Sequence, residues 1–178
     1  MAAAGLLVRS QRIGYREAWD AQRALARARA AGTLPDVLWL LEHPPVYTVG
    51  RNGRREDLHL SDEALVGAMA DAAALPDGRP GEDAMGLYAG GRKLGSVGIR
   101  VSGGVTTHGL ALNRDPDLEW FRLMTACGAP DVEATSIAAE GGDPRRERVE
   151  ADLAASLAAR LGLRLEPSTL EDLLPLAA

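Results

Sequence analysis

The chain has 178 residues, of which 46% are hydrophobic and 25% charged, a balance typical of a single soluble globular domain. Its formal net charge of −5 argues against a nucleic-acid surface, which needs a basic patch. No apolar run approaches the roughly 18 residues of a membrane span, the N-terminus lacks the basic region of a signal peptide, and a single cysteine excludes an internal disulfide. We therefore expect a cytoplasmic protein that binds neither nucleic acid nor membranes.

The first part of the chain predicts strands around one helix. Residues 6–9 favour a short edge strand. Apolar residues at helical spacing predict a helix over 15–31, which Gly32 ends. The apolar run 37–41 is typical of a buried strand, and a further strand is expected over 46–49, after a turn that two prolines impose.

The second part predicts three more helices and four more strands. Its strongest start signal is Asp143-Pro144, a capping residue followed by proline at the first helical position. The predicted helices cover residues 61–75, 115–124 and 143–162, and the predicted strands cover residues 85–88, 93–102, 106–112 and 163–165. With no internal repeat, the pattern favours an α+β fold, with a mixed, largely antiparallel sheet flanked by helices.

Lysine is almost absent from the sequence. Lysine and arginine together number 20, and Lys93 is the only lysine. Because arginine keeps its proton in proteins and lysine can lose one, a lone lysine invites a proton-transfer role, although chance explains it equally well. Glycines at 91, 95 and 98 surround it, and these either form turns or let a ligand approach the backbone closely. The spacing does not match a phosphate-binding loop.

Cys127 is the only cysteine and precedes Gly128. A reactive cysteine is partly exposed and lies near positive charge, whereas a structural one is buried and inert. Taken alone, the lone cysteine fits the structural role better. His108 offers a second partner for a thiol, but we expect it to bond backbone at a strand start. The histidines are too scattered for a zinc site, so we expect no metal.

Taken in chain order, these features resemble the octanoyltransferase family of lipoate biosynthesis. The resemblance runs from about Gly14 to Gly162. The stretches that carry it are Gly14–Trp19, Leu41–Arg51, Arg92–Arg100, Thr107–Asn113, Cys127-Gly128 and Thr135-Ser136.

The resemblance implies the fold of biotin and lipoate protein ligases and an acyltransferase reaction without a cofactor. The cysteine would take an octanoyl group from octanoyl-acyl carrier protein as a thioester. A lysine amine of a lipoyl domain would then take it as an amide. The implied acceptors are lipoyl domains of 2-oxoacid dehydrogenase complexes and the glycine cleavage protein.

The resemblance also implies roles for individual residues. Cys127 would be the acyl-thioester nucleophile, and Lys93 would lower its pKa and transfer its proton. The sole cysteine and the sole lysine of the chain thus form the implied catalytic pair. The acyl chain would bind along two segments, which consist of Ser96, Val97 and Gly98, and of Gly109, Leu110 and Ala111.

One part of the family pattern is missing. The family carries a glycine-rich segment, roughly Arg-Gly-Gly followed by His-Gly-Pro-Gly-Gln, between Arg51 and Lys93, and this sequence has no counterpart. We expect residues 1–178 to form a single octanoyltransferase-like domain with a deletion near residues 60–66. Three other functions stay open: a non-catalytic or degenerate relative that binds lipoyl domain or acyl carrier protein, a thioesterase, and an ATP-using lipoate ligase.

Overall fold

The computed structural model describes residues 2–46, 67, 70–75, 79–80, 86–122 and 132–177. The chain divides into two compact units, which are described separately. The first unit comprises the described residues of Met1–Leu58, Ile99–Gly109 and Leu161–Ala178, and the second those of His59–Gly98 and Leu110–Arg160. No helix in the described ranges is long and apolar enough to cross a lipid bilayer.

The first unit contains a parallel sheet of three strands in the order β2-β1-β7. Its strands are β1 (Ala3–Arg12), β2 (Asp36–Glu42) and β7 (Leu163–Ser168). β1 is the central strand, with Leu6 paired to Val37 on one side and to Glu166 on the other. The predicted edge strand at residues 6–9 is therefore wrong, because the last strand of the chain returns to cover that edge.

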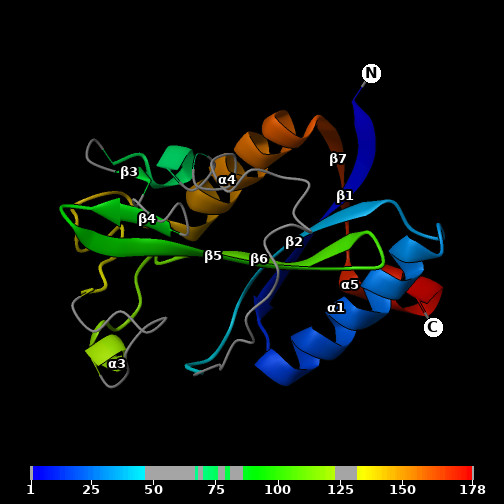
Figure 1. Ribbon diagram of the computed structural model, residues 1–178, viewed down its shortest axis with the longest axis horizontal. Helices are drawn as coiled ribbons and strands as arrows, with labels where there is room; N and C mark the ends of the chain where they lie inside the picture. The colour runs from blue at the N-terminus through cyan, green and yellow to red at the C-terminus, as the bar shows by residue number, and fades with distance from the viewer. Residues whose placement is uncertain are drawn as a thin grey trace. The chain divides into compact units, whose positions relative to one another are not determined.

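Helix α1 (Tyr15–Ala30) packs against this sheet through small and apolar residues. Val8, which is fully buried, lies in one cluster with Leu25 and Ala28 of α1. The C-terminal turns α5 (Leu170–Leu173) and η3 (Leu174–Ala177) join the same cluster, and Figure 1 shows them in red beside the blue helix. The core of this unit thus links the first and last segments of the chain.

The other sheet is antiparallel, in the order β3-β4-β5-β6, and it belongs to the second unit except for residues Ile99–Gly109, so the expected α+β fold with an antiparallel sheet is confirmed. Gly103 and Gly104 both have positive φ and form a tight two-residue turn that joins β5 to β6 as a long hairpin (Figure 1). The strands are β3 (Arg79–Pro80), β4 (Gly86–Ala89), β5 (Arg92–Ser102) and β6 (Val105–Leu112).

The described structure also contains the helices α3 (Glu119–Arg122) and α4 (Arg146–Leu161). α4 buries Val149, Leu153 and Leu157 at the helical spacing that the sequence predicted. Within the predicted helix 61–75, residues 67 and 70–73 are helical and the remainder lies largely outside the described residues. The predicted strand over residues 46–49 also lies mostly outside them.

Candidate active site

Lys93 lies at the start of β5 and has hydrogen-bonded backbone neighbours on both sides. On one side it pairs with Tyr88 of β4. On the other side its amide donates to the carbonyl of Glu133 (2.7 Å), and its own carbonyl accepts from the amide of Thr135 (2.9 Å). Residues 133–135 thus act as a short parallel strand along β5, bridged to Lys93 at Ala134. This segment, which we call the 133–135 strap, holds the lysine backbone in place.

The side chain of Lys93 is half-buried and follows the surface of β4. Its Nζ lies 5.7 Å from the centroid of the Tyr88 ring, within the range of a cation–π interaction. A Cβ added at Gly86 would lie 2.9 Å from Lys93 Cε and 2.7 Å from the carbonyl oxygen of Gly95. The lysine stem therefore occupies space that only a glycine at position 86 leaves open.

A β-bulge adjoins the lysine. Tyr88 pairs with Lys93 and Leu87 pairs with Gly95, so Leu94 is an extra residue in β5. Leu94 is fully buried, and its carbonyl accepts a hydrogen bond from the amide of Asn113 (2.9 Å). The bulge lets two buried residues, Leu94 and Gly95, follow each other in one strand.

A buried carboxylate closes the strap. The hydroxyl of Thr135 donates to Oε1 of Glu140 (2.5 Å), and Arg92 donates to Oε2 of the same carboxylate (3.0 Å). The Glu140 side chain is only 15% exposed, whereas that of Arg92 is 46% exposed. The side-chain amide of Asn113 donates to the carbonyl of Thr135 (2.9 Å). The strap is therefore fixed by side chains as well as by backbone.

The two predicted acyl-binding segments lie on neighbouring strands. Ser96, Val97 and Gly98 belong to β5, and Gly109, Leu110 and Ala111 belong to β6, which is hydrogen-bonded to β5. Val97 is buried, whereas Gly98 and Ala111 are exposed. The boundary between the two units crosses β5 after Gly98 and β6 after Gly109.

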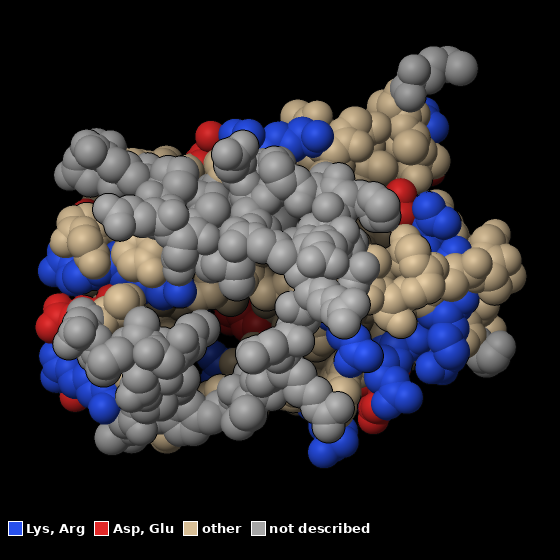
Figure 2. Space-filling model, viewed as in Figure 1, with Lys and Arg blue, Asp and Glu red and all other residues tan. Residues whose placement is uncertain are grey.

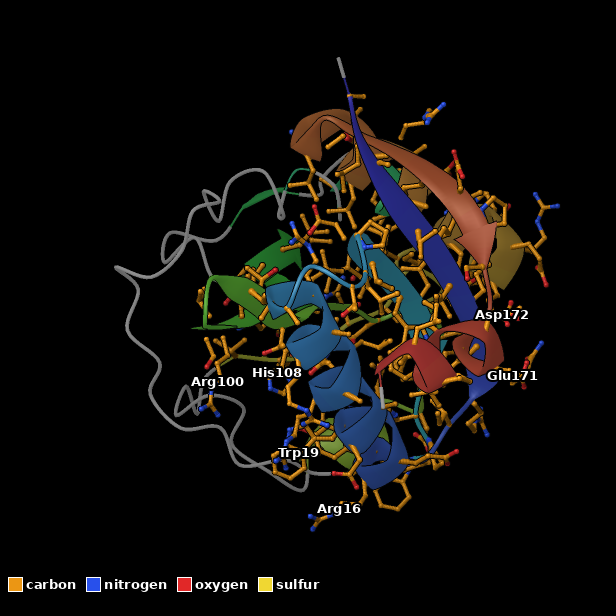
Figure 3. All side chains as sticks on the ribbon, turned by 90° about the vertical axis from the view of Figure 1, so that its right-hand side faces the viewer. Arg16, Trp19, Arg100, His108, Glu171 and Asp172 are labelled. Carbon is orange, nitrogen blue, oxygen red and sulfur yellow. The ribbon has the colours of Figure 1, made fainter. Side chains whose placement is uncertain are left out.

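β6 is irregular where it meets that boundary. His108 has a φ of 67° and Gly109 a φ of 125°, and the half-buried residues Gly109 and Leu110 follow one another where the strand otherwise alternates. His108 is exposed, but partial desolvation and then the Arg100 guanidinium lower its pKa. Figure 3 shows these two side chains on the hairpin, Arg100 from β5 and His108 from β6. Within the described residues, no hydrogen bond joins the His108 ring to backbone.

Comparison with known proteins identifies the family. The lipoyl protein ligase A/B catalytic domain matches residues 14–68 and 56–158. An octanoyltransferase of Acidothermus cellulolyticus is 32% identical over 210 positions, covering 92% of this chain and 93% of the relative. Octanoyltransferases of Alkalilimnicola ehrlichii and Roseiflexus sp. are 36% and 37% identical, covering 80% and 74% of this chain and 86% and 76% of the relatives. This chain is an enzyme of the octanoyltransferase family.

The alignments with the octanoyltransferase relatives contain more positions than this chain contributes residues. The comparison with the Acidothermus cellulolyticus relative spans 210 positions, yet the whole chain has 178 residues. The relative therefore carries residues that this chain lacks. The family domain also matches in two segments that overlap at residues 56–68. The deletion near residues 60–66 stays a prediction.

A second octanoyltransferase-like motif surrounds His43, which follows β2. Nδ1 of His43 lies 2.8 Å from the carbonyl oxygen of Ile13, so this nitrogen carries the hydrogen and donates it. The Tyr15 ring meets the histidine edge-on at 5.3 Å between ring centroids. The motifs Gly14–Trp19 and Leu41–Arg51 thus each supply one ring of this contact.

The same motif leads onto a basic surface of α1. The guanidinium groups of Arg16 and Arg23 lie 5.4 and 5.9 Å from the centroid of the Trp19 ring. Figure 3 shows Arg16 and Trp19 side by side at the start of the helix, and Figure 2 shows blue side chains gathered where α1 lies. This surface is positive in a chain whose net charge is −5.

Cys127, the other half of the predicted octanoyltransferase pair, lies outside the described residues. In the sequence it precedes Glu133 of the strap by six residues. Among the described residues, no three histidines, cysteines or carboxylates gather as a metal site would require. Sequence reasoning noted Thr135-Ser136 but missed Glu140, because an isolated glutamate carries no signal of burial.

Proposed function

We propose that this protein transfers an octanoyl group from acyl carrier protein, through a thioester on Cys127, to a lysine of a lipoyl domain. The observation that carries the proposal is Lys93. It is the sole lysine of the chain, and the strap and β4 hold its backbone on both sides. We infer that the acyl group is octanoyl because the relatives are named octanoyltransferases.

The proposed reaction has two steps. In the first, Lys93 Nζ accepts the thiol proton of Cys127, and the thiolate attacks the thioester carbonyl of the donor. The carrier sulfur leaves and takes that proton. Because one thioester replaces another, the free-energy change of this step is close to zero. In the second, the lysine amine of the acceptor attacks the enzyme thioester and passes a proton, through Lys93, to the Cys127 sulfur. An amide forms, and the Cys127 sulfur is released.

Lysine suits this role better than arginine does. A neighbouring ammonium stabilises a thiolate and so lowers the pKa of the thiol. A guanidinium would supply the charge but would not accept a proton at neutral pH. We therefore assign two roles to Lys93, thiolate stabilisation and proton transfer.

The acyl chain is proposed to lie along β5 and β6. Ser96, Val97 and Gly98 would contact it from one strand, and Gly109, Leu110 and Ala111 from the other. Each buried methylene contributes about 0.8 kcal/mol of binding. These segments form only one wall of the proposed site. Without the glycine-rich segment, several methylenes of the octanoyl chain would stay exposed, and their contribution to the binding free energy would be lost.

Further parts of the proposal rest on the family alone. They are a single domain over residues 1–178 with a deletion near residues 60–66, a cytoplasmic location, and acceptors among the lipoyl domains of 2-oxoacid dehydrogenase complexes and the glycine cleavage protein. The competing function is a relative that binds acyl carrier protein or lipoyl domain without catalysis. The deletion favours that second candidate.

Intact-mass spectrometry after mixing with octanoyl-acyl carrier protein tests the proposal. The native chain should gain one octanoyl group that hydroxylamine removes, and adding lipoyl domain should move the group to the domain. Cys127→Ser should abolish the adduct. Binding of donor without any adduct would identify a non-catalytic relative, and release of octanoate without acceptor a thioesterase.

Lys93 is tested by rate. Lys93→Arg should slow transfer by about 100-fold or more, the usual contribution of a positioned acid–base group. Arg122→Lys is the control, because it exchanges the same two side chains at a position where the side chain is 76% exposed. If Lys93→Arg transfers octanoyl at the native rate, the lysine is not the proton-transfer group.

A further inference from the structure

The interaction between Glu140 and Thr135 is the feature of this unit that the proposed chemistry does not use. The Glu140 carboxylate accepts from the Thr135 hydroxyl and from the Arg92 guanidinium, with only 15% of its side chain exposed. Thr135 itself is 2% exposed. Enclosing a carboxylate costs desolvation free energy, and the hydrogen bonds from its two partners offset that cost.

We infer that Glu140 is a positioning residue for Lys93; this inference rests on the proposed role of that lysine. The connection runs through two bonds. Glu140 holds the Thr135 hydroxyl, and the Thr135 amide donates to the carbonyl of Lys93 (2.9 Å). Glu140 also holds Arg92, the residue that precedes Lys93 in β5. One carboxylate thus anchors both the strap and the strand that the strap holds.

Carboxylate chemistry fits this role. An ionised carboxylate only accepts hydrogen bonds, and both of its neighbours here are donors. Without it, the buried Thr135 hydroxyl would lose this acceptor, and an unsatisfied buried group is costly enough to displace the segment that carries it. A glutamine would still offer one oxygen to Thr135. Arg92, which is 46% exposed, would turn to solvent.

A purely structural role is the alternative, and α4 offers a matched control. Glu150 forms an ion pair with Arg146 at 2.6 Å, and its side chain is 16% exposed, close to the value for Glu140. Both pairs lie in the second unit, but Glu150 belongs to α4, whereas the strap is held by the backbone of β5 and by the side chains of Glu140 and Asn113. Glu150→Ala therefore removes a comparably enclosed ion pair without loosening Lys93.

The sole lysine provides a direct readout. Reductive methylation with ¹³C-formaldehyde labels Lys93 and the terminal amine, and Lys93→Arg identifies the lysine resonance by its loss. We expect Glu140→Ala to shift this resonance and to slow octanoyl transfer by about 10- to 100-fold, because small displacements of a reacting group cost up to about 100-fold. Glu140→Gln should retain most of the rate. Glu150→Ala should lower the melting temperature without either effect.

Thr135→Val and Thr135→Ser provide the test should Glu140→Ala not fold. The valine keeps the shape but has no hydroxyl, so it should shift the resonance, whereas the serine should not. A Lys93 resonance unchanged in Glu140→Ala or Thr135→Val would overturn the inference. The resonance is measured without substrate. A native chain that transfers no octanoyl group would therefore refute the proposed function, while the resonance still decides whether Glu140 positions Lys93.

Discussion

Gly86→Ala is the smallest change that the structure predicts to disturb Lys93. The added methyl would lie 2.7 Å from the carbonyl oxygen of Gly95 and 2.9 Å from Lys93 Cε, where ordinary contacts begin at 3.4 Å. The backbone oxygen is the harder obstacle, because β4 and β5 are paired at Leu87 and Gly95. The lysine stem can move and the strand pair cannot, so the substitution should both strain the sheet and displace the lysine.

The magnitude follows from the overlap. The methyl is about 0.7 Å too close to the Gly95 oxygen. Overpacking of this kind costs about 1–3 kcal/mol, which for a chain of this size lowers the melting temperature by about 2–12 °C. Displacement of Lys93 should slow octanoyl transfer at least about tenfold even at temperatures where the variant is folded.

Calorimetry and single-turnover transfer measure the two effects. Gly98→Ala is the control for stability alone, because a Cβ at that position in β5 meets nothing within 4 Å. It should keep or raise the melting temperature, since alanine restricts the unfolded chain. A Gly86→Ala variant with native melting temperature and native transfer rate would refute the packing described around Lys93.

Two further predictions concern pH. Hydrogen bonds from the Arg145 side chain and backbone lower the pKa of Asp143 from 3.8 to about 2, so its stabilising effect is complete above pH 3.8 and lost as the pH falls through 2. Urea unfolding should show native protein more stable than Asp143→Asn at pH 6 and equal to it below pH 2. The lowered pKa of His108 gives a pH dependence in the same direction: below the ordinary value of 6.5, protonation favours the unfolded chain, so stability falls with the pH. His108→Asn, which tolerates positive φ, should therefore lose less stability than the native protein between pH 7 and pH 5, and an equal loss in both would exclude His108 as the cause.

Sequence reasoning located the two long helices well because their signals are local, whereas the helix predicted over 115–124 begins only at Glu119. The helix predicted over 15–31 is α1 at Tyr15–Ala30, and the one predicted over 143–162 is α4 at Arg146–Leu161. The strands of the hairpin were also predicted within about two residues. Periodicity, caps and turn glycines lie within a few positions of the elements that they define.

Long-range pairing was beyond such reasoning. Nothing in residues 6–9 shows that β1 becomes the central strand, since its second partner begins at Leu163. The strap is equally invisible, because Ala134 pairs with Lys93 without belonging to a regular strand. Lys93 could be proposed from the sequence because it is the only lysine, whereas Glu140 is one of 25 acidic residues and its enclosure depends on the tertiary fold.

The contact between Lys93 and the strap also bears on how the protein folds. Glu133 follows Lys93 by 40 residues, so their hydrogen bond closes a long loop. Closing a loop of about 40 residues costs about 3 kcal/mol of chain entropy, whereas the β5–β6 hairpin closes through a two-residue turn. Local contacts of that kind form first and distant ones later. A folding intermediate with the hairpin alone would carry Lys93 without its strap, and acyl transfer would therefore report the last stage of folding.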